Sequence, residues 1–166
     1  MKANLLVATM RPLGHGLYLD ILDRFSSSSE VELGVLLIQQ SGFEIARLKA
    51  PQATLFERGL GRWPNESASC PISAVTTLSA LTIESDFQSF QATIYQMLNR
   101  HDTSGTFRLV DREMYFWSLY FGIGGAIIEK GVTHLFFDIT PHVASEYIAF
   151  WIGKKLDKAI MFLQPI

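Results

Sequence analysis

Two apolar stretches decide the fold class: Asn4-Leu-Leu-Val-Ala-Thr9 and Val31-Glu-Leu-Gly-Val-Leu-Leu-Ile38, with the turn Gly14-His15-Gly16 between them. Both stretches are continuous apolar runs, which are typical of strands buried on both faces of a parallel sheet. Between them, apolar residues from Leu17 to Phe25 recur with the spacing of an amphipathic helix. The first third of the chain therefore predicts two parallel strands joined by a helix.

The last third of the chain repeats this pattern. Val132-Thr-His-Leu-Phe-Phe-Asp-Ile139 predicts a third buried strand, and Ala159-Ile-Met-Phe-Leu163 predicts a fourth. Between them, Thr140 is expected to cap a helix whose first residue is Pro141. The pattern predicts an α/β fold, with helices between strands near 4–9, 31–38, 132–139 and 159–163. We expect a Rossmann-like, doubly wound and mainly parallel sheet with helices on both faces.

Residues 40–106 are expected to form an irregular and helical insertion within one domain that spans residues 1–166. Ser41-Gly-Phe-Glu44 and Ser85-Asp-Phe-Gln88 have the spacing of helix capping boxes, so each predicts the start of a helix. A long helix is expected from about Leu109 to Lys130, ended by Gly131. Its Phe121-Gly-Ile-Gly-Gly-Ala126 stretch lies inside a helix, and we interpret it as close helix packing rather than as a cofactor loop.

Composition excludes several classes of function. The 166 residues include 14 Lys+Arg and 16 Asp+Glu, a net charge of −2 with no run of like charge, which argues against nucleic-acid binding. The single cysteine, Cys70, excludes a disulfide framework and a Cys-based zinc site. Four scattered histidines give no metal-ligand spacing, so no metal is expected.

No membrane span or targeting segment is expected. The longest apolar run, Met114–Ile128, is shorter than the ~20 residues that a transmembrane helix needs. Lys2 is the only charged residue before the first apolar stretch. Arg11-Pro12 ends this stretch before a signal-peptide core could form. We therefore expect a cytoplasmic location.

The first candidate site is the turn that follows the first strand. In an open α/β sheet, ligands bind outside the carboxyl ends of the strands, where this turn lies. Gly14 and Gly16 allow the backbone to approach a ligand, while Arg11 and His15 could contact it. The dinucleotide fingerprint is not met, because Leu19 stands where a small residue is needed. A turn selected for its geometry alone is the alternative.

The second candidate site is Asp138-Ile-Thr-Pro-His142, which follows the third strand. His142 is expected in the first helical turn, with Glu146 within reach at i+4 to orient its imidazole. Asp138 and Thr140 lie in the same turn and are candidate substrate-binding residues. Alternatively, Thr140 only caps the helix and His142 is simply exposed.

The position of the two candidate turns, after the first and the third strand, strengthens the case that both belong to one site. Parallel strands place both turns at one edge of the sheet, so we expect the imidazoles of His15 and His142 within roughly 15 Å of each other. His134 is better interpreted as a hydrogen-bonded core residue, and Cys70 has no obvious base nearby.

These motifs also resemble a known family. A buried strand leading into a Gly-His-Gly turn is similar to the N-terminal domain of GT-B-type glycosyltransferases. Thr133–His142, followed by an amphipathic helix, Lys-Lys-Leu and a strand, resembles capsular-polysaccharide biosynthesis proteins of that group. The resemblance covers residues 1–38 and 107–166. It implies two Rossmann-like domains across a cleft, with the acceptor on the N-terminal domain and the nucleotide-sugar on the C-terminal one, which this sequence lacks.

The resemblance implies the acceptor-side domain of a glycosyltransferase-like protein in surface-polysaccharide biosynthesis. A sugar or glycan acceptor and a nucleotide-sugar would be its ligands, with no other cofactor. His15 or His142 would act as a general base on a sugar hydroxyl or hydrogen-bond a donor phosphate. Without a second domain, no transferase activity is expected.

The alternative is a non-catalytic α/β module that binds a nucleotide or a partner protein. Residues 159–163 are apolar on both faces, which fits a central or covered strand. We therefore expect the isolated chain to self-associate or to be stable only as an oligomer.

Overall fold

The strands form one parallel sheet in the computed structural model, which describes residues 2–8, 16–58, 70–103, 105 and 107–163, with only the backbone of residues 16–19. The strand order is β3-β2-β1-β4-β5, and every pair of neighbours is parallel. The strands are β1 (Ala3–Ala8), β2 (Val31–Ile38), β3 (Thr54–Glu57), β4 (His134–Phe137) and β5 (Ala159–Phe162). The predicted α/β class and the parallel pairing of the first two runs are confirmed.

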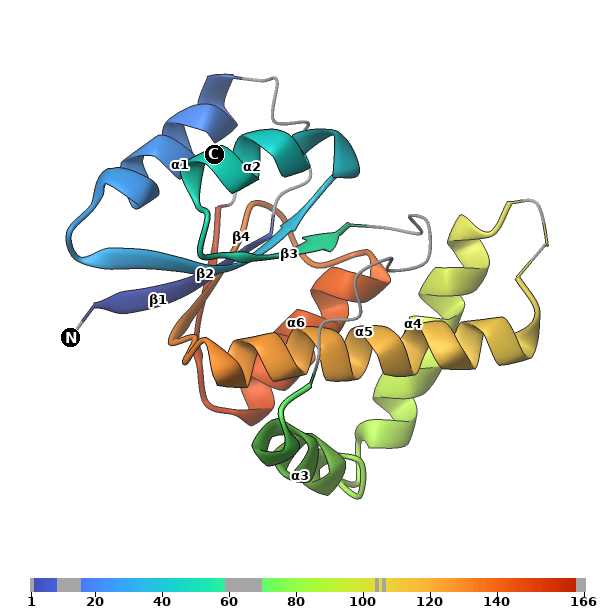
Figure 1. Cartoon of the computed structure of the whole chain (residues 1–166). Helices are drawn as coiled ribbons and strands as arrows, with labels where there is room; N and C mark the ends of the chain where they lie inside the picture. Colours follow the sequence, from blue (N-terminus) through green and yellow to red (C-terminus); the bar gives the residue numbers. More distant parts are fainter. Residues whose placement is uncertain (1, 9–15, 59–69, 104, 106, 164–166) are drawn as a thin grey trace.

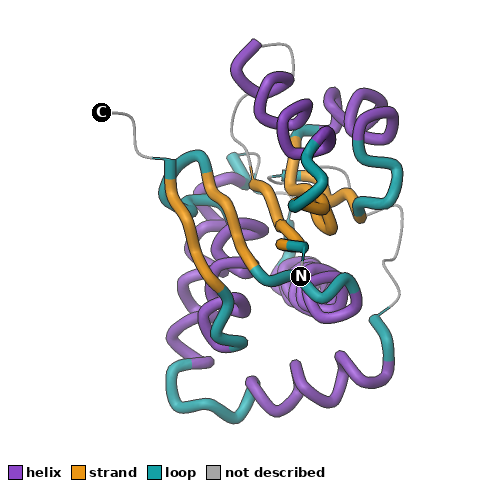
Figure 2. The backbone as a smooth tube through the Cα atoms, turned by 90° about the vertical axis from the view of Figure 1, so that its left-hand side faces the viewer, coloured by secondary structure: helices purple, strands orange, loops and turns teal. Residues whose placement is uncertain are grey.

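Helices cover both faces of this sheet. Figures 1 and 2 show α1 (Gly16–Ser27) and α2 (Phe43–Lys49) on one face, with α5 (Leu109–Glu129) and α6 (Ala144–Lys155) on the other. The helix α3 (Ile72–Leu81) packs on α5, and α4 (Phe87–His101) packs on α5 and α6. A single 3-10 turn at Gln40–Gly42 leads into α2. The arrangement is the expected doubly wound one.

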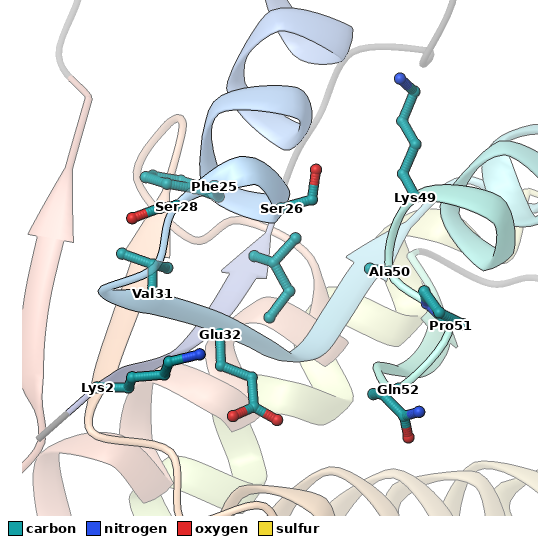
Figure 3. A pocket seen from close by; sticks show the side chains of 11 residues that line it. Lys2, Phe25, Ser26, Ser28, Val31, Glu32, Lys49, Ala50, Pro51 and Gln52 are labelled. Carbon is teal, nitrogen blue, oxygen red and sulfur yellow. The ribbon is translucent and has the colours of Figure 1, made fainter.

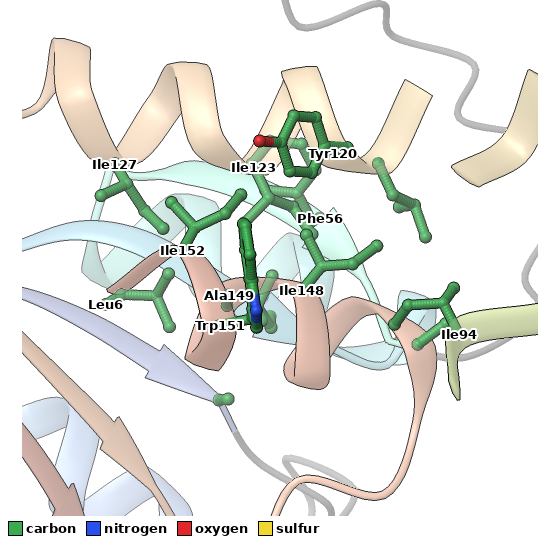
Figure 4. Packing of buried hydrophobic residues seen from close by; sticks show 14 of the residues in the cluster. Leu6, Phe56, Ile94, Tyr120, Ile123, Ile127, Ile148, Ala149, Trp151 and Ile152 are labelled. Atoms are coloured by element: carbon green, nitrogen blue, oxygen red, sulfur yellow. The ribbon is translucent and has the colours of Figure 1, made fainter. Parts of the chain in front are cut away.

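The central strand β1 divides the core into two layers. Leu5 and Val7 pack with the residues of α1 and α2, whereas Leu6 and Ala8 pack with α3 to α6. In Figure 4, Leu6 lies below Ile127 of α5 and Ile152 of α6. Because side chains alternate along a strand, a continuous apolar run is what a strand covered on both faces requires.

A bulge in β2 depends on Gly34. The pairing of β1 with β2 shifts register between Leu5 and Leu6, where Leu33 and Val35 become successive partners and Gly34 is passed over. A Cβ at Gly34 would lie 2.2 Å from Oδ1 of Asn4. Glycine is therefore the residue that allows the two strands to approach at this point.

The glycine-rich stretch of α5 packs closely against neighbouring helices, as the sequence predicted. A Cβ at Gly124 would lie 2.6 Å from a methyl group of Leu78 in α3 and 3.0 Å from one of Ile152 in α6. The hydroxyl of Tyr120 donates a hydrogen bond to the Leu78 carbonyl at 2.9 Å, which ties α5 to α3. Aromatic rings complete this layer, with Phe90 stacked on Trp151 at a centroid distance of 4.3 Å.

The middle of the chain is more regular than the sequence indicated. The strand β3 and the helix α3 were not predicted, because a four-residue Thr-Leu-Phe-Glu segment and a helix that buries only Ala74 and Leu78 show no clear periodicity. The helices α2 and α4 begin near the predicted capping boxes. Neither has a side-chain cap, however, since Gly42 and Asp86 occupy the cap positions without a capping hydrogen bond. Residues 59–69 of the expected insertion lie outside the described residues.

The strand β5 is an edge strand, which corrects the expectation that residues 159–163 are central or covered. Its only strand partner among the described residues is β4, and Met161, Phe162 and Leu163 are exposed. The helix α6 covers one side of this edge, where Phe162 contacts Phe150. Continuous hydrophobicity therefore did not distinguish a covered strand from an exposed apolar edge.

No helix among the described residues is long and apolar enough to cross a membrane. The long helix α5, which contains the longest apolar run, buries its glycines and aromatic side chains against α3, α4 and α6 instead.

We expect Gly124→Val to destabilise the fold by about 1–3 kcal/mol, because the new side chain would overlap Leu78 and Ile152. Met114→Val is the matched control, since it places the same β-branched residue on the same helix at an exposed position. The control should cost less than about 1 kcal/mol. Urea unfolding of both variants measures the difference, and equal losses would contradict the packing described for α5.

Candidate functional site

The strand order reverses between β1 and β4. The chain leaves β1 for α1 on one face and leaves β4 for α6 on the opposite face, so the carboxyl ends of these two strands form the topological switch point. Ligands of open α/β sheets bind outside this point. The backbone N–H of Asp138 donates to the Ala8 carbonyl at 3.2 Å, which brings the end of β4 next to the end of β1.

The connection from β4 to α6 differs from the prediction. The helix begins at Ala144 rather than at Pro141, and Val143, not Thr140, occupies the cap position with extended backbone angles of φ −116° and ψ 155°. Pro141 and Val143 are buried, whereas Thr140 is exposed. Because Pro141 and Val143 are both buried, the chain stays extended through Val143, and the helix does not begin at Pro141.

His142 consequently lies two residues before α6. Its side chain is 41% exposed, and its Nδ1 is 3.2 Å from the Thr140 carbonyl oxygen. Its Nε2 is 3.2 Å from Nη2 of Arg58. A guanidinium can only donate, so Nε2 is the acceptor and the ring proton lies on Nδ1, facing Thr140. Both ring nitrogens of His142 therefore have partners.

Glu146 forms a buried ion pair with Arg58. Nε of Arg58 donates to Oε1 of Glu146, and the two side chains are only 8% and 1% exposed. The second carboxylate oxygen is 3.4 Å from the backbone N–H of His142 and 3.6 Å from its Nδ1. Glu146 thus lies within reach of His142, as expected. It contacts the backbone amide and lies too far from the ring for a good hydrogen bond.

Arg58 reaches this position from the far end of the sheet. Its backbone N–H donates to the Ile38 carbonyl at 2.8 Å, which continues the pairing of β2 with β3 by one residue. Its side chain then extends to α6, which follows β4. The pair Arg58–Glu146 therefore joins two segments 88 residues apart in the sequence. Sequence analysis missed Arg58, because β3 was not recognised and a basic residue after a strand carries no other signal.

Several predicted site residues lie outside the described residues. These are Arg11, Gly14 and His15, so the expected proximity of His15 and His142 remains a prediction. Gly16 is the first residue of α1. Asp138 is buried at the end of β4 and takes part in an interaction of its own.

The other histidines and the cysteine lie elsewhere. His134 is in β4 with its Nδ1 2.8 Å from the hydroxyl of Thr133, which fits the predicted hydrogen-bonded role. His101 ends α4 and is exposed. Burial, together with the charge of Glu129, raises the pKa of the Cys70 thiol, which does not favour a nucleophile. Within the described part of the chain, no group of His, Cys, Asp and Glu is arranged to hold a metal ion.

A cavity of about 370 Å³ lies at the opposite, amino edge of the sheet. Figure 3 shows Phe25 and Ser28 on its α1 side and Lys49 and Pro51 on its α2 side. Lys49 is paired with Asp23. The cavity is separated from the switch point by the length of the strands, and ligands of this class of sheet bind at the other edge.

Comparison of the chain with protein-family models, with curated proteins and with solved structures gave no match.

We expect Arg58→Ala to cost about 3–5 kcal/mol of stability, because it leaves the Glu146 carboxylate buried without its partner. The double variant Arg58→Met, Glu146→Leu should be closer to the parent than Arg58→Ala, since it buries no charge. Arg108→Ala is the control: this side chain is 77% exposed and pairs with Asp111, so its loss should cost less than about 1 kcal/mol. Urea unfolding measures all three variants, and a similar loss for Arg58→Ala and Arg108→Ala would refute the role of the buried pair.

Proposed function

We propose that this chain is the acceptor-side, Rossmann-like domain of a glycosyltransferase-like protein in surface-polysaccharide biosynthesis, which binds a sugar or a nucleotide-sugar at the switch point between β1 and β4. One observation carries the proposal: a half-exposed histidine, His142, is fixed at this point by a buried ion pair. Holding an exposed imidazole in a single orientation requires ordering that a purely solvated residue does not need.

The ion pair supports a site in this position. Nη2 of Arg58 and the Thr140 carbonyl fix the ring of His142, and Glu146 fixes its backbone amide. Functional side chains are held by a second layer of hydrogen-bonded groups in this manner. Sugar hydroxyls are both donors and acceptors, so a rim of imidazole, carbonyl and hydroxyl groups suits them. The proposal also includes a cytoplasmic location. It further includes self-association of the chain, and the exposed apolar edge at β5 supports this self-association.

A second candidate function is a non-catalytic module that binds a nucleotide or a partner protein. It is favoured by the engagement of Nε2 of His142, whose lone pair accepts from Arg58. A general base needs a free lone pair within reach of the proton that it removes. For His142 to act as a base on a sugar hydroxyl, the ligand must first draw the Arg58 guanidinium away. The two candidates therefore differ in what happens to this contact on binding.

We expect the chain to bind a UDP-sugar, and His142→Ala to weaken that binding by up to about tenfold, because a sugar hydroxyl would donate to Nε2 in place of Arg58 and the alanine removes this hydrogen bond. His101→Ala is the matched control, because His101 is exposed at the end of α4 and should leave affinity unchanged. Calorimetric titration of the three proteins with a UDP-sugar, with UDP and with the neutral sugar measures this. Unchanged affinity in His142→Ala, or no binding of any of the three compounds, would refute the proposed function.

The ¹⁵N NMR shifts of the His142 ring distinguish the two candidates. A bound ligand that frees Nε2 from Arg58 should move the Nε2 resonance and supports the glycosyltransferase-like role. Binding with Nε2 unmoved supports the non-catalytic module.

A further inference from the structure

The outer side of β5 is unpaired within the described part of the chain. The backbone N–H groups of Ala159 and Leu163 donate to carbonyls at either end of β4, at 3.1 and 2.9 Å. Because successive residues of a strand direct their backbone groups to opposite sides, the N–H and C=O groups of Ile160 and Phe162 point to the open edge. Figure 2 shows β5 as the last strand on the left of the sheet. This edge therefore offers hydrogen-bonding groups to another strand.

The side chains of β5 are apolar on both faces of the sheet. Phe162 contacts Phe150 of α6, with ring centroids 6.1 Å apart, and Ile160 packs on the same helical layer. Met161 alternates to the other face and is 40% exposed. The stretch from Ala159 to Leu163 contains no charged residue and no proline. Edge strands commonly carry such residues to prevent pairing with another chain, and this one does not.

The other edge of the sheet, β3, has a different character. This strand has four residues, of which Phe56 is buried. Glu57 ends the strand and Arg58 follows it, with its guanidinium committed to the ion pair with Glu146. A contact between β5 of one copy and β3 of another would also repeat without closing and would build fibres. Two β5 edges, in contrast, form a closed pair about a two-fold axis.

We infer that β5 pairs with β5 of a second copy of this chain, antiparallel about a two-fold axis at Met161. Ile160 then lies opposite Phe162 of the second copy, and the two residues exchange their free N–H and C=O groups as a hydrogen-bonded pair. Met161 faces its own counterpart as a close pair without hydrogen bonds. The sheet thereby continues across both copies, and the apolar edge is covered.

The register follows from which backbone groups are free. Only every second residue of β5 directs its backbone to the edge, so the pairing can shift only by two residues. A shift in one direction places Lys158 opposite Phe162, and a shift in the other places Gln164 opposite Ile160. Pairing about Met161 is the register in which apolar residues meet only apolar residues.

The pairing leaves the candidate site free. The switch point lies between β1 and β4, and β4 separates it from β5. An antiparallel two-fold pairing places the switch points of the two copies at opposite edges of the continuous sheet, so each copy binds its ligand independently. The inference rests on the self-association that the proposed function includes, and it specifies the surface and the partner.

The test is sedimentation equilibrium of the full chain, which should show a dimer. Met161→Lys places two positive charges opposite each other, so it should raise the dissociation constant of the dimer by about tenfold or more. Met161→Glu should do the same. An equimolar mixture of these two variants should restore the dimer, because opposite charges then meet across the axis. Met114→Lys is the matched control, since Met114 is 55% exposed on α5, and it should dimerise as the parent does.

A neutral variant tests the same contact without a charge. In a Cys70→Ala background, Met161→Cys should link two copies through a disulfide under mild oxidation, because close cross-strand pairs have a suitable Cα separation. Met114→Cys in the same background should not. A monomeric parent, an undiminished dimer of Met161→Lys, or a mixture that stays monomeric would overturn the inference. Oligomers larger than a dimer, or equal disulfide formation at the two positions, would overturn it as well.

Failure of this pairing and failure of the proposed function are distinguishable. A monomeric chain that binds a UDP-sugar through His142 removes the pairing alone. A dimer that Met161→Lys disrupts, with no affinity for a UDP-sugar, UDP or the neutral sugar, removes the proposed ligand binding alone.

Discussion

A strand in the middle of a parallel sheet must bury both of its faces, and β1 meets this requirement with four consecutive apolar side chains. Leu5 and Val7 anchor α1 and α2 on one face, while Leu6 and Ala8 anchor the larger layer of α3 to α6 on the other. This alternation lets β1 support both helical layers, and the strand order reverses beside β1 because α1 and α6 lie on opposite faces of the sheet. The switch point exists because one strand supports two layers whose connections run in opposite directions.

The ion pair of Arg58 with Glu146 exploits this arrangement. It connects the edge strand β3 with α6 at the carboxyl edge of the sheet, on the side of the larger helical layer. Burying two charges has a desolvation cost that the attraction between them only partly offsets, so a hydrophobic pair would serve stability as well or better. The polar pair has a different consequence: it fixes the ring and the backbone amide of His142. The need to position His142 explains why Arg58 and Glu146 are ionisable at a buried position where apolar side chains would also pack.

The same pair affects the start of α6. An acidic residue in the first turn of a helix ordinarily compensates the free amides and the dipole. Here the carboxylate of Glu146 is turned away to Arg58, and Val143 has no capping group. Among the described residues, the first backbone amides of this helix have no acceptor. The pairing of Glu146 with Arg58 therefore has two consequences: it fixes the ring of His142, and it leaves the start of α6 without a side-chain cap.

The sequence by itself determined most helices and the main strands, because these follow from local periodicity, and it determined the parallel pairing because helices alternate with those strands along the chain. The runs at β1 and β2 and the glycine-rich packing stretch of α5 are examples, and His142 was placed at the carboxyl edge by the order of elements alone. It could not determine β3, whose four residues carry no pattern, and so it could not find Arg58. It also placed the start of α6 too early, since Thr140 and Pro141 satisfy local capping rules that the burial of Pro141 and Val143 overrides. Only the tertiary structure decided the partner of Glu146, because a contact across 88 residues depends on where the strands lie in the sheet and not on their spacing in the chain.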